Sequence, residues 1–218
     1  LTPARIRVRR GFDVPVLFGS LTVEWDQATR EPAAVYNSAV LLDDKGRKVG
    51  VFDKMYLLIF GEYIPFYEEL DFMKRFFKRH RMSHFNRGKD VKVFPFWHQG
   101  KKYRIGPLIC YEDILPAFGR RVALLKPNLF VNVTNDAWFG ETSEPYEHLA
   151  LAVYRSVEHR ISMVRAVNTG VSTIIDSTGR VVRSTPAVGS RAGSDPGGDS
   201  AGEIRRSGYK KEGAGVYR

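Results

Sequence analysis

The fold is decided by the stretch Ile105-Gly106-Pro107-Leu108-Ile109-Cys110-Tyr111-Glu112-Asp113, which holds the single cysteine of this 218-residue chain. Its apolar residues predict a buried strand that ends at Cys110, and the acidic pair that follows predicts the start of a helix. A thiol at such a turn lies beside the positive end of the helix, which lowers the pKa of the thiol. The stretch is therefore typical of a cysteine nucleophile, although a lone cysteine in a strand is more often a small buried apolar residue.

Composition limits the class of protein. The length fits one domain, and a hydrophobic share of 43% is enough to fill a core. One cysteine excludes an internal disulfide framework. The net charge of +10 indicates an anionic partner, which could be nucleic acid, anionic lipid or an acidic substrate. The sequence has no apolar run of the length that a membrane span needs, no P-loop and no GxGxxG motif.

Strands and helices are predicted to alternate along the chain, which is typical of an α/β fold. Strands are expected at 14–23, 36–42, 48–52, 91–96, 102–106 leading into Cys110, 127–134, 171–176 and 180–182. Helices are expected at 65–80, 113–125 and 145–166. From Val188 onward Gly, Ser and charged residues dominate, so we expect a domain over 1–187 and a disordered tail over 188–218.

Several charged side chains interrupt or flank these apolar patterns. Lys54 and Glu62 lie eight positions apart within an apolar segment, where charges are costly unless they are paired or used. They predict either a surface loop with a salt bridge or part of a site. The helix at 65–80 has a basic face, which is either solvated or lies against an anionic membrane. His148 and His159 could share a helix face, but no third ligand accompanies them, so no metal site is predicted.

The arrangement resembles the nitrilase superfamily and, within it, the apolipoprotein N-acyltransferase family. The likeness covers roughly residues 12 to 186. It is carried by Tyr36-Asn37-Ser38, Asp53-Lys54-Met55-Tyr56-Leu57, Phe60-Gly61-Glu62-Tyr63-Ile64-Pro65, Ile109-Cys110-Tyr111-Glu112, Asn135-Asp136-Ala137-Trp138-Phe139-Gly140, His148, Arg165-Ala166-Val167-Asn168-Thr169-Gly170 and Asp176-Ser177-Thr178-Gly179.

The resemblance implies a nitrilase-type αββα sandwich and a Glu-Lys-Cys triad. Cys110 would be the nucleophile that forms an acyl thioester, Lys54 would steady the charged intermediate, and Glu62 would support the lysine and the substrate. Supporting or substrate-binding roles are implied for Tyr111, Glu112, Asn135 and Trp138. No cofactor and no metal are implied.

The reaction implied by the resemblance moves an acyl chain from a membrane phospholipid to the N-terminal amine of an apolipoprotein. Its partners would be the phospholipid donor, the lipoprotein acceptor and the membrane surface, with no nucleic acid. The implied location is the outer face of the bacterial inner membrane.

Three departures from the family pattern are visible. The general-base glutamate of the family lies upstream of the strand at 14–23, and Glu24 comes too late in the order to replace it. Ile59 stands where the family usually has proline, and the membrane-spanning helices of the family are missing. We therefore expect a domain without its N-terminal part, with weak or no turnover. The alternatives are a soluble carbon–nitrogen hydrolase, an inactive truncated fragment, or a non-catalytic basic module that binds nucleic acid or membrane.

Overall fold

The computed structural model describes residues 14–63, 85–136 and 142–185. The predicted basic helix at 65–80, Trp138 and the predicted tail at 188–218 lie outside these residues. No helix within the described ranges is long and apolar enough to cross a membrane.

The first sheet has three antiparallel strands: β1 (Val16–Trp25), β2 (Pro32–Leu42) and β3 (Lys48–Asp53), in that order. The tight turn between β2 and β3 has the residues that such turns favour. Gly46 has a positive φ of 70°, and the Asp43 carboxylate accepts hydrogen bonds from the backbone N–H groups of Lys45 and Arg47. The turn sets the register in which β3 delivers Asp53 and Lys54 to the end of the sheet.

The second sheet has six strands in chain order: β4 (Phe94–His98), β5 (Lys101–Ile109), β6 (Leu129–Thr134), β7 (Ser162–Val167), β8 (Thr173–Ile175) and β9 (Val181–Ser184). Strands β5, β6 and β7 are parallel, and the remaining pairs are antiparallel. Because parallel strands end at one edge, Cys110 and the residues after Thr134 come together there.

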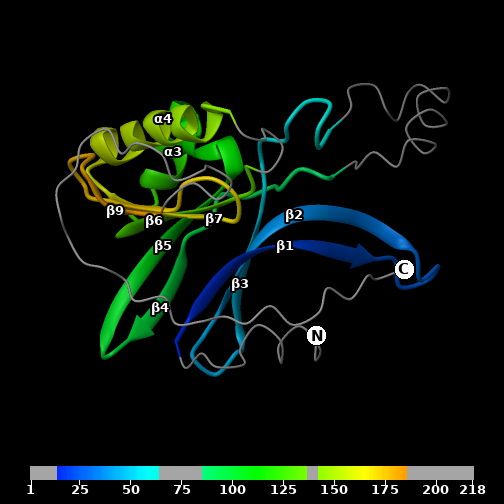
Figure 1. Ribbon diagram of the computed structural model, residues 1–218. Coiled ribbons are helices and arrows are strands. Elements are labelled where there is room, and N and C mark those ends of the chain that lie inside the picture. The colour runs from blue at the N-terminus through cyan, green and yellow to red at the C-terminus, as the bar shows by residue number, and fades with distance from the viewer. Residues whose placement is uncertain (1–13, 64–84, 137–141, 186–218) are drawn as a thin grey trace, which may run out of the picture.

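Helices cover one face of the second sheet, and the first sheet lies against the other (Figure 1). The helical elements are η1 (Cys110–Ile114), a 3₁₀ turn, followed by α3 (Pro116–Ala123) and α4 (Glu144–His159). A Cβ on Gly106 of β5 would lie 2.7 Å from the Val122 side chain, so α3 packs closely on this strand. On the opposite face, a Cβ on Gly50 of β3 would lie 2.7 Å from the ring of Phe94, so the sheets meet closely.

The result is a helix–sheet–sheet stack whose core joins all three layers. Buried side chains of this core include Ala39, Leu41 and Phe52 from the first sheet, and Leu108, Ile109, Phe130 and Met163 from the second, with Phe118 and Val122 from α3. The predicted α/β nitrilase-type class is confirmed. Among the described residues no helix covers the outer face of the β1–β3 sheet (Figure 1).

The helix predicted over 145–166 was wrong in its last third. Helix α4 ends at His159, and Arg160 takes the left-handed conformation with φ 53°. The next residues form β7, whose Met163 and Arg165 are buried while their neighbours are less so. This period of two is a strand pattern, and pairing with β6 satisfies its backbone groups. The apolar spacing of the helix continues by chance into β7, which hid the boundary.

The helix predicted over 113–125 is also shorter than expected. Residues 110–114 form the 3₁₀ turn η1, and α3 begins at Pro116, a residue favoured in the first helical turn. The strand predicted at 91–96 is found slightly later, as β4. Both differences shift the elements by a few residues without changing their order.

Candidate active site

Cys110 lies at a sharp turn between β5 and η1. The strand ends at Ile109, and Cys110 is the first residue of the 3₁₀ turn with φ 52°. Few residues other than glycine adopt this left-handed conformation, so the backbone at the thiol is strained. The cysteine is free and only partly buried. The turn therefore lifts the sulfur out of the strand toward the edge where the parallel strands end.

Lys54 and Glu62 form a buried ion pair beside this turn. The Lys54 ammonium is 1% exposed and lies 2.6 Å from Glu62 Oε2. Glu62 is itself held on both oxygens, because Asn37 Nδ2 donates to Oε1 at 2.7 Å and the Leu58 N–H donates to Oε2 at 3.0 Å. These bonds fix the carboxylate, and the carboxylate fixes the lysine. The salt bridge predicted for this pair is present, and it joins a buried lysine to a partly buried glutamate of the following turn.

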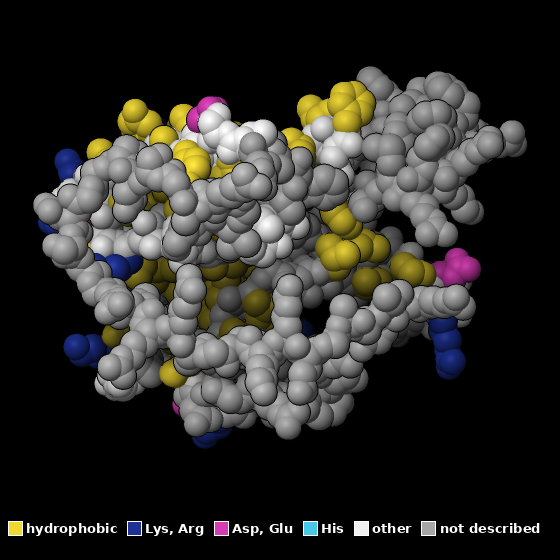
Figure 2. Space-filling view, viewed as in Figure 1, with side chains coloured by type: hydrophobic (Ala, Val, Ile, Leu, Met, Phe, Trp, Pro, Cys, Tyr) yellow, Lys and Arg dark blue, Asp and Glu magenta, His cyan; other side chains and the backbone are white. Residues whose placement is uncertain are grey.

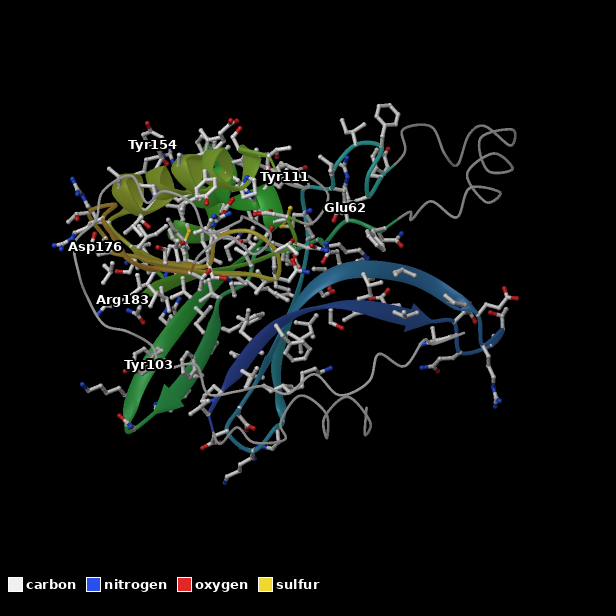
Figure 3. The ribbon with its side chains drawn as sticks, in the orientation of Figure 1. Glu62, Tyr103, Tyr111, Tyr154, Asp176 and Arg183 are labelled. Carbon is white, nitrogen blue, oxygen red and sulfur yellow. The ribbon has the colours of Figure 1, made fainter. Side chains whose placement is uncertain are left out.

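The ion pair reaches Cys110 and Tyr111. Lys54 Nζ lies 4.9 Å from the centre of the Tyr111 ring, and its charge lowers the pKa of the Cys110 thiol. Glu62 and Tyr111 are labelled in Figure 3, at the end of the six-stranded sheet where the turn lies. Burial, together with the charges of Glu62 and Glu112, raises the pKa of Tyr111 to about 12, so its phenol stays protonated.

The pKa of the Cys110 thiol is raised, which is opposite to the sequence expectation. Burial is the main cause, and the Lys54 charge, the Thr134 hydroxyl and the Tyr111 backbone N–H act against it. The expected helix dipole is weak here, because η1 has only five residues. A thiolate at this position therefore depends on its specific neighbours, and Lys54 is the cation among them.

Glu112 connects two segments of the site through hydrogen bonds to their backbones. Its Oε1 accepts hydrogen bonds from the backbone N–H groups of Met55, at 2.7 Å, and Tyr56, at 3.1 Å. Its Oε2 accepts the N–H of Ile109 at 2.9 Å. Burial raises the pKa of Glu112 to about 7, although the three N–H donors and Lys54 favour the charged form. One carboxylate thus joins the segment after Lys54 to the strand before Cys110.

A buried cluster behind the turn was not predicted. His148 of α4 lies between two carboxylates, with Nε2 2.8 Å from Asp113 Oδ1 and Nδ1 3.3 Å from Asp136 Oδ1. Arg165 Nε donates to Asp113 Oδ2 at 2.9 Å. Burial lowers the pKa of His148, but its hydrogen bonds to the two aspartates outweigh burial and raise it to about 9. The imidazole is therefore a cation that ties α4 to η1 and to the end of β6.

Two further residues contact the turn from the neighbouring strand β6. Asn132 Nδ2 donates to the carbonyl oxygen of Cys110 at 2.8 Å, and the Thr134 hydroxyl acts to lower the pKa of the Cys110 thiol. Neither had a predicted role. The signal available in the sequence was that both are polar residues inside an otherwise apolar buried strand. Asn135, which was predicted, is exposed, and its Oδ1 accepts a hydrogen bond from Thr169 at 3.4 Å.

One group of side chains has the composition of a metal site. Ligand atoms of Asp136, Glu144 and His148 lie within 4.8 Å of one another. Both nitrogens of His148 already face carboxylates, so the imidazole has no lone pair free for a metal while it is protonated. His159, the other histidine considered in the sequence, packs edge-on against Phe130 instead of joining this group.

Comparison with known proteins places this chain in a family. A family model for carbon-nitrogen hydrolases matches residues 10–190. The chain belongs to this family. An apolipoprotein N-acyltransferase from Geobacter metallireducens is 41% identical over 150 residues, which are 69% of this chain and 28% of that protein. Another from Bdellovibrio bacteriovorus is 35% identical over 176 residues, 79% of this chain and 31% of that protein.

The carbon-nitrogen hydrolase fold is also seen in solved structures. An amidase of the nitrilase superfamily from Nesterenkonia AN1 matches with a TM-score of 0.58 and 18% identity, over 85% of this chain and 62% of that one. This likeness supports the fold alone. The predicted resemblance to the nitrilase superfamily and its apolipoprotein N-acyltransferase branch is confirmed. The chain spans about a third of the length of the curated relatives it matches.

Proposed function

We propose that this carbon-nitrogen hydrolase domain transfers an acyl chain from a phospholipid to the N-terminal amine of an apolipoprotein, through a thioester on Cys110. The observation that carries the proposal is the buried Lys54–Glu62 pair beside a strained, partly buried cysteine. A cation held in a site of low polarity stabilises both a thiolate and the oxyanion that follows its attack. Relatives named apolipoprotein N-acyltransferase support the choice of reaction.

In the first half-reaction the Cys110 thiolate attacks the ester carbonyl of the phospholipid. The new S–C bond forms as the ester C–O bond breaks, and the leaving alkoxide takes a proton to become a lysophospholipid. In the second half-reaction an amine attacks the thioester. The N–C bond forms, the C–S bond breaks, and the proton lost by the amine restores the thiol. Lys54 faces the negative charge in both halves, and Glu62 keeps Lys54 in place.

The remaining predicted site residues act around this centre. Glu112 holds the Lys54 segment against the Cys110 strand, and the Tyr111 ring packs against the Lys54 ammonium. Asn135 is exposed, and we propose that it contacts the acceptor. Trp138 lies outside the described residues, and a substrate-binding or supporting role is proposed for it from the resemblance.

The proposed membrane contact is an apolar turn next to Glu62. Leu58, Ile59 and Phe60 are exposed by 47%, 57% and 64%, and Figure 2 shows hydrophobic side chains gathered over this turn. Three large apolar side chains on one exposed turn gain free energy by entering a lipid surface. The net charge of +10 would add attraction to anionic lipid. Both features suit a domain that contacts a membrane, and the location that we propose from the family is the outer face of the bacterial inner membrane.

The test is the intact mass of the chain after incubation with phospholipid vesicles. Even where turnover is weak, the first half-reaction leaves an acyl group on the sulfur, so we expect a gain of one acyl chain, which hydroxylamine removes and which Cys110→Ser abolishes. Because Cys110 is the single cysteine, no other thiol can carry the label. Lys54→Gln should lower the yield, whereas Lys101→Gln, at the far end of β5 from Cys110, should not. A gain that persists in Cys110→Ser, or none from wild type with intact secondary structure, contradicts the proposal.

The second candidate function is hydrolysis of a small amide or nitrile. The match to the carbon-nitrogen hydrolase family model favours it, and the same thiolate and lysine would serve. Release of ammonia from short aliphatic amides in the absence of vesicles, abolished by Cys110→Ser, would support this function. Acyl labelling from vesicles without ammonia release would support acyl transfer instead.

A further inference from the structure

Thr134 lies one residue beyond the last pair that β5 and β6 form before the nucleophile. It is the last residue of β6 and is buried, and β6 pairs with β5 so that Val133 lies opposite Ile109. The next step along both strands brings Thr134 to the level of Cys110. There its hydroxyl lies near enough to the thiol to lower the pKa of Cys110, and it also lies 3.2 Å from Asp136 Oδ1. One hydroxyl group therefore serves a sulfur and a carboxylate.

The Thr134 hydroxyl faces two groups, the Cys110 sulfur and the Asp136 carboxylate, but it has a single proton to donate. A threonine hydroxyl has one proton and two acceptor lone pairs. A carboxylate can only accept, so the proton points to Asp136 and Thr134 accepts from the Cys110 S–H. When the sulfur becomes a thiolate it can only accept, and the same hydroxyl can turn and donate to it. Asp136 is not left alone by this turn, because His148 Nδ1 faces the same oxygen at 3.3 Å.

We propose that the Thr134 hydroxyl is a switchable hydrogen-bond partner of Cys110, which accepts from the thiol and donates to the thiolate, while Asp136 and His148 hold it in position. The proposal rests on the proposed role of Cys110 as nucleophile. Thr134 touches the reacting sulfur and is a catalytic residue in this sense. Asp136 acts through Thr134 and is a positioning residue.

The Thr134 hydroxyl stabilises the thiolate form of Cys110 more than the thiol form. An S–H group is a weak donor, so the bond that Thr134 accepts from the thiol is weak. A bond donated to a charged sulfur is stronger, as bonds to ions are. Removing the hydroxyl therefore costs the thiolate more than the thiol. The other groups facing the sulfur are Lys54 from the end of β3, Glu62 from the following turn, and the Tyr111 backbone N–H of η1.

The experiment measures how fast iodoacetamide alkylates Cys110 across a range of pH, followed by intact mass. The thiol first loses its proton to solvent; the thiolate then forms a C–S bond and displaces iodide. Thr134→Val keeps the side-chain shape and removes the hydroxyl, and Thr134→Ser keeps the hydroxyl. We expect Thr134→Val to slow alkylation about tenfold below the thiol pKa, equal to a shift of about one pH unit. Thr134→Ser should stay within about threefold of wild type.

The matched control is Thr173→Val on β8. Thr173 is also buried in this sheet, and its Oγ1 has no hydrogen-bond partner among the described residues. It should leave the alkylation profile unchanged. If Thr134→Val disturbs the fold, seen in its circular dichroism, Thr134→Ala is measured instead. A profile of the hydroxyl-free variant that coincides with wild type, or an equal shift from Thr173→Val, would overturn the proposal. Alkylation needs no phospholipid, so its outcome is separate from that of the acyl-transfer test.

Discussion

Replacing Glu62 with glutamine tests the ion pair on which the proposed site depends. Glu62→Gln keeps the size of the side chain and one oxygen acceptor but leaves the Lys54 ammonium buried without its counter-charge. Breaking a buried pair by removing one partner typically costs about 3–5 kcal/mol. Glu62 is 15% exposed, so some water reaches it and the lower end applies, about 3 kcal/mol.

The assay is urea unfolding followed by circular dichroism. With a slope of about 2–3 kcal/mol per molar urea, a loss of about 3 kcal/mol lowers the midpoint by about 1 M. Heating should show the same loss as a fall in Tm of about 6–12 °C. The double variant Lys54→Met with Glu62→Gln removes both charges, so it should be less destabilised than the two single changes added together.

The control for this prediction is Glu158→Gln on α4. Glu158 also forms an ion pair, in this case with Arg155 at 2.8 Å, but the Glu158 side chain is 40% exposed. Because water reaches this carboxylate and Arg155 also donates to the carbonyl oxygen of Ile114, this variant should lose less than about 1 kcal/mol. Equal losses for Glu62→Gln and Glu158→Gln would refute the reasoning, as would single changes at Lys54 and Glu62 whose effects simply add.

Three other changes test separate parts of the structure. Because the pKa of His148 is raised from 6.5 to about 9, its contribution to stability is complete below pH 6.5 and is lost as pH rises through 9. At about 1.4 kcal/mol per pKa unit the loss of unfolding free energy is about 3 kcal/mol, measured by urea unfolding at pH 6 and pH 10. The variant His148→Gln should lack this pH dependence. Equal dependence of stability on pH in the variant and in wild type would contradict the role of His148 in the buried cluster. Glu112→Gln should lower the unfolding free energy by about 2–3 kcal/mol, because an amide N–H₂ would face a backbone N–H donor; an unchanged urea midpoint would contradict this. Phe60→Asn should weaken vesicle co-sedimentation about tenfold while the fold stays intact, because asparagine tolerates the φ of 64° and removes an apolar ring; undiminished binding would exclude the turn as the membrane contact.

Local patterns made much of the fold predictable. The β2–β3 turn follows from Asp43 and Gly46, whose preferences act within a few residues. The turn at Cys110 follows from an apolar run that stops before an acidic pair. The nearness of Lys54 and Cys110 came from the resemblance, since no local pattern relates residues so far apart. The end of α4 was missed because the side chains of β7 continue its apolar spacing, and only pairing with β6 decides between helix and strand.

The buried cluster around His148 could not be predicted from the sequence in the same way. Its members Asp113, Asp136 and Arg165 belong to three different elements, and each alone has the ordinary composition of a surface loop or strand. Their meeting depends on how strands β5, β6 and β7 align. The raised pKa of Cys110 was missed for a related reason: burial is a property of the assembled fold, and it outweighs the cation that the sequence does show.

The left-handed backbone at Cys110 separates two demands on the same residue. For stability alone glycine would suit this turn better, because it adopts a positive φ without a steric cost of about 1–2 kcal/mol. A substitution of Cys110 by glycine would therefore give a more stable protein that has no thiol. A chain that keeps cysteine at this turn is less stable but retains its reactive thiol. The residue at this one position therefore changes thermal stability and reactivity in opposite directions.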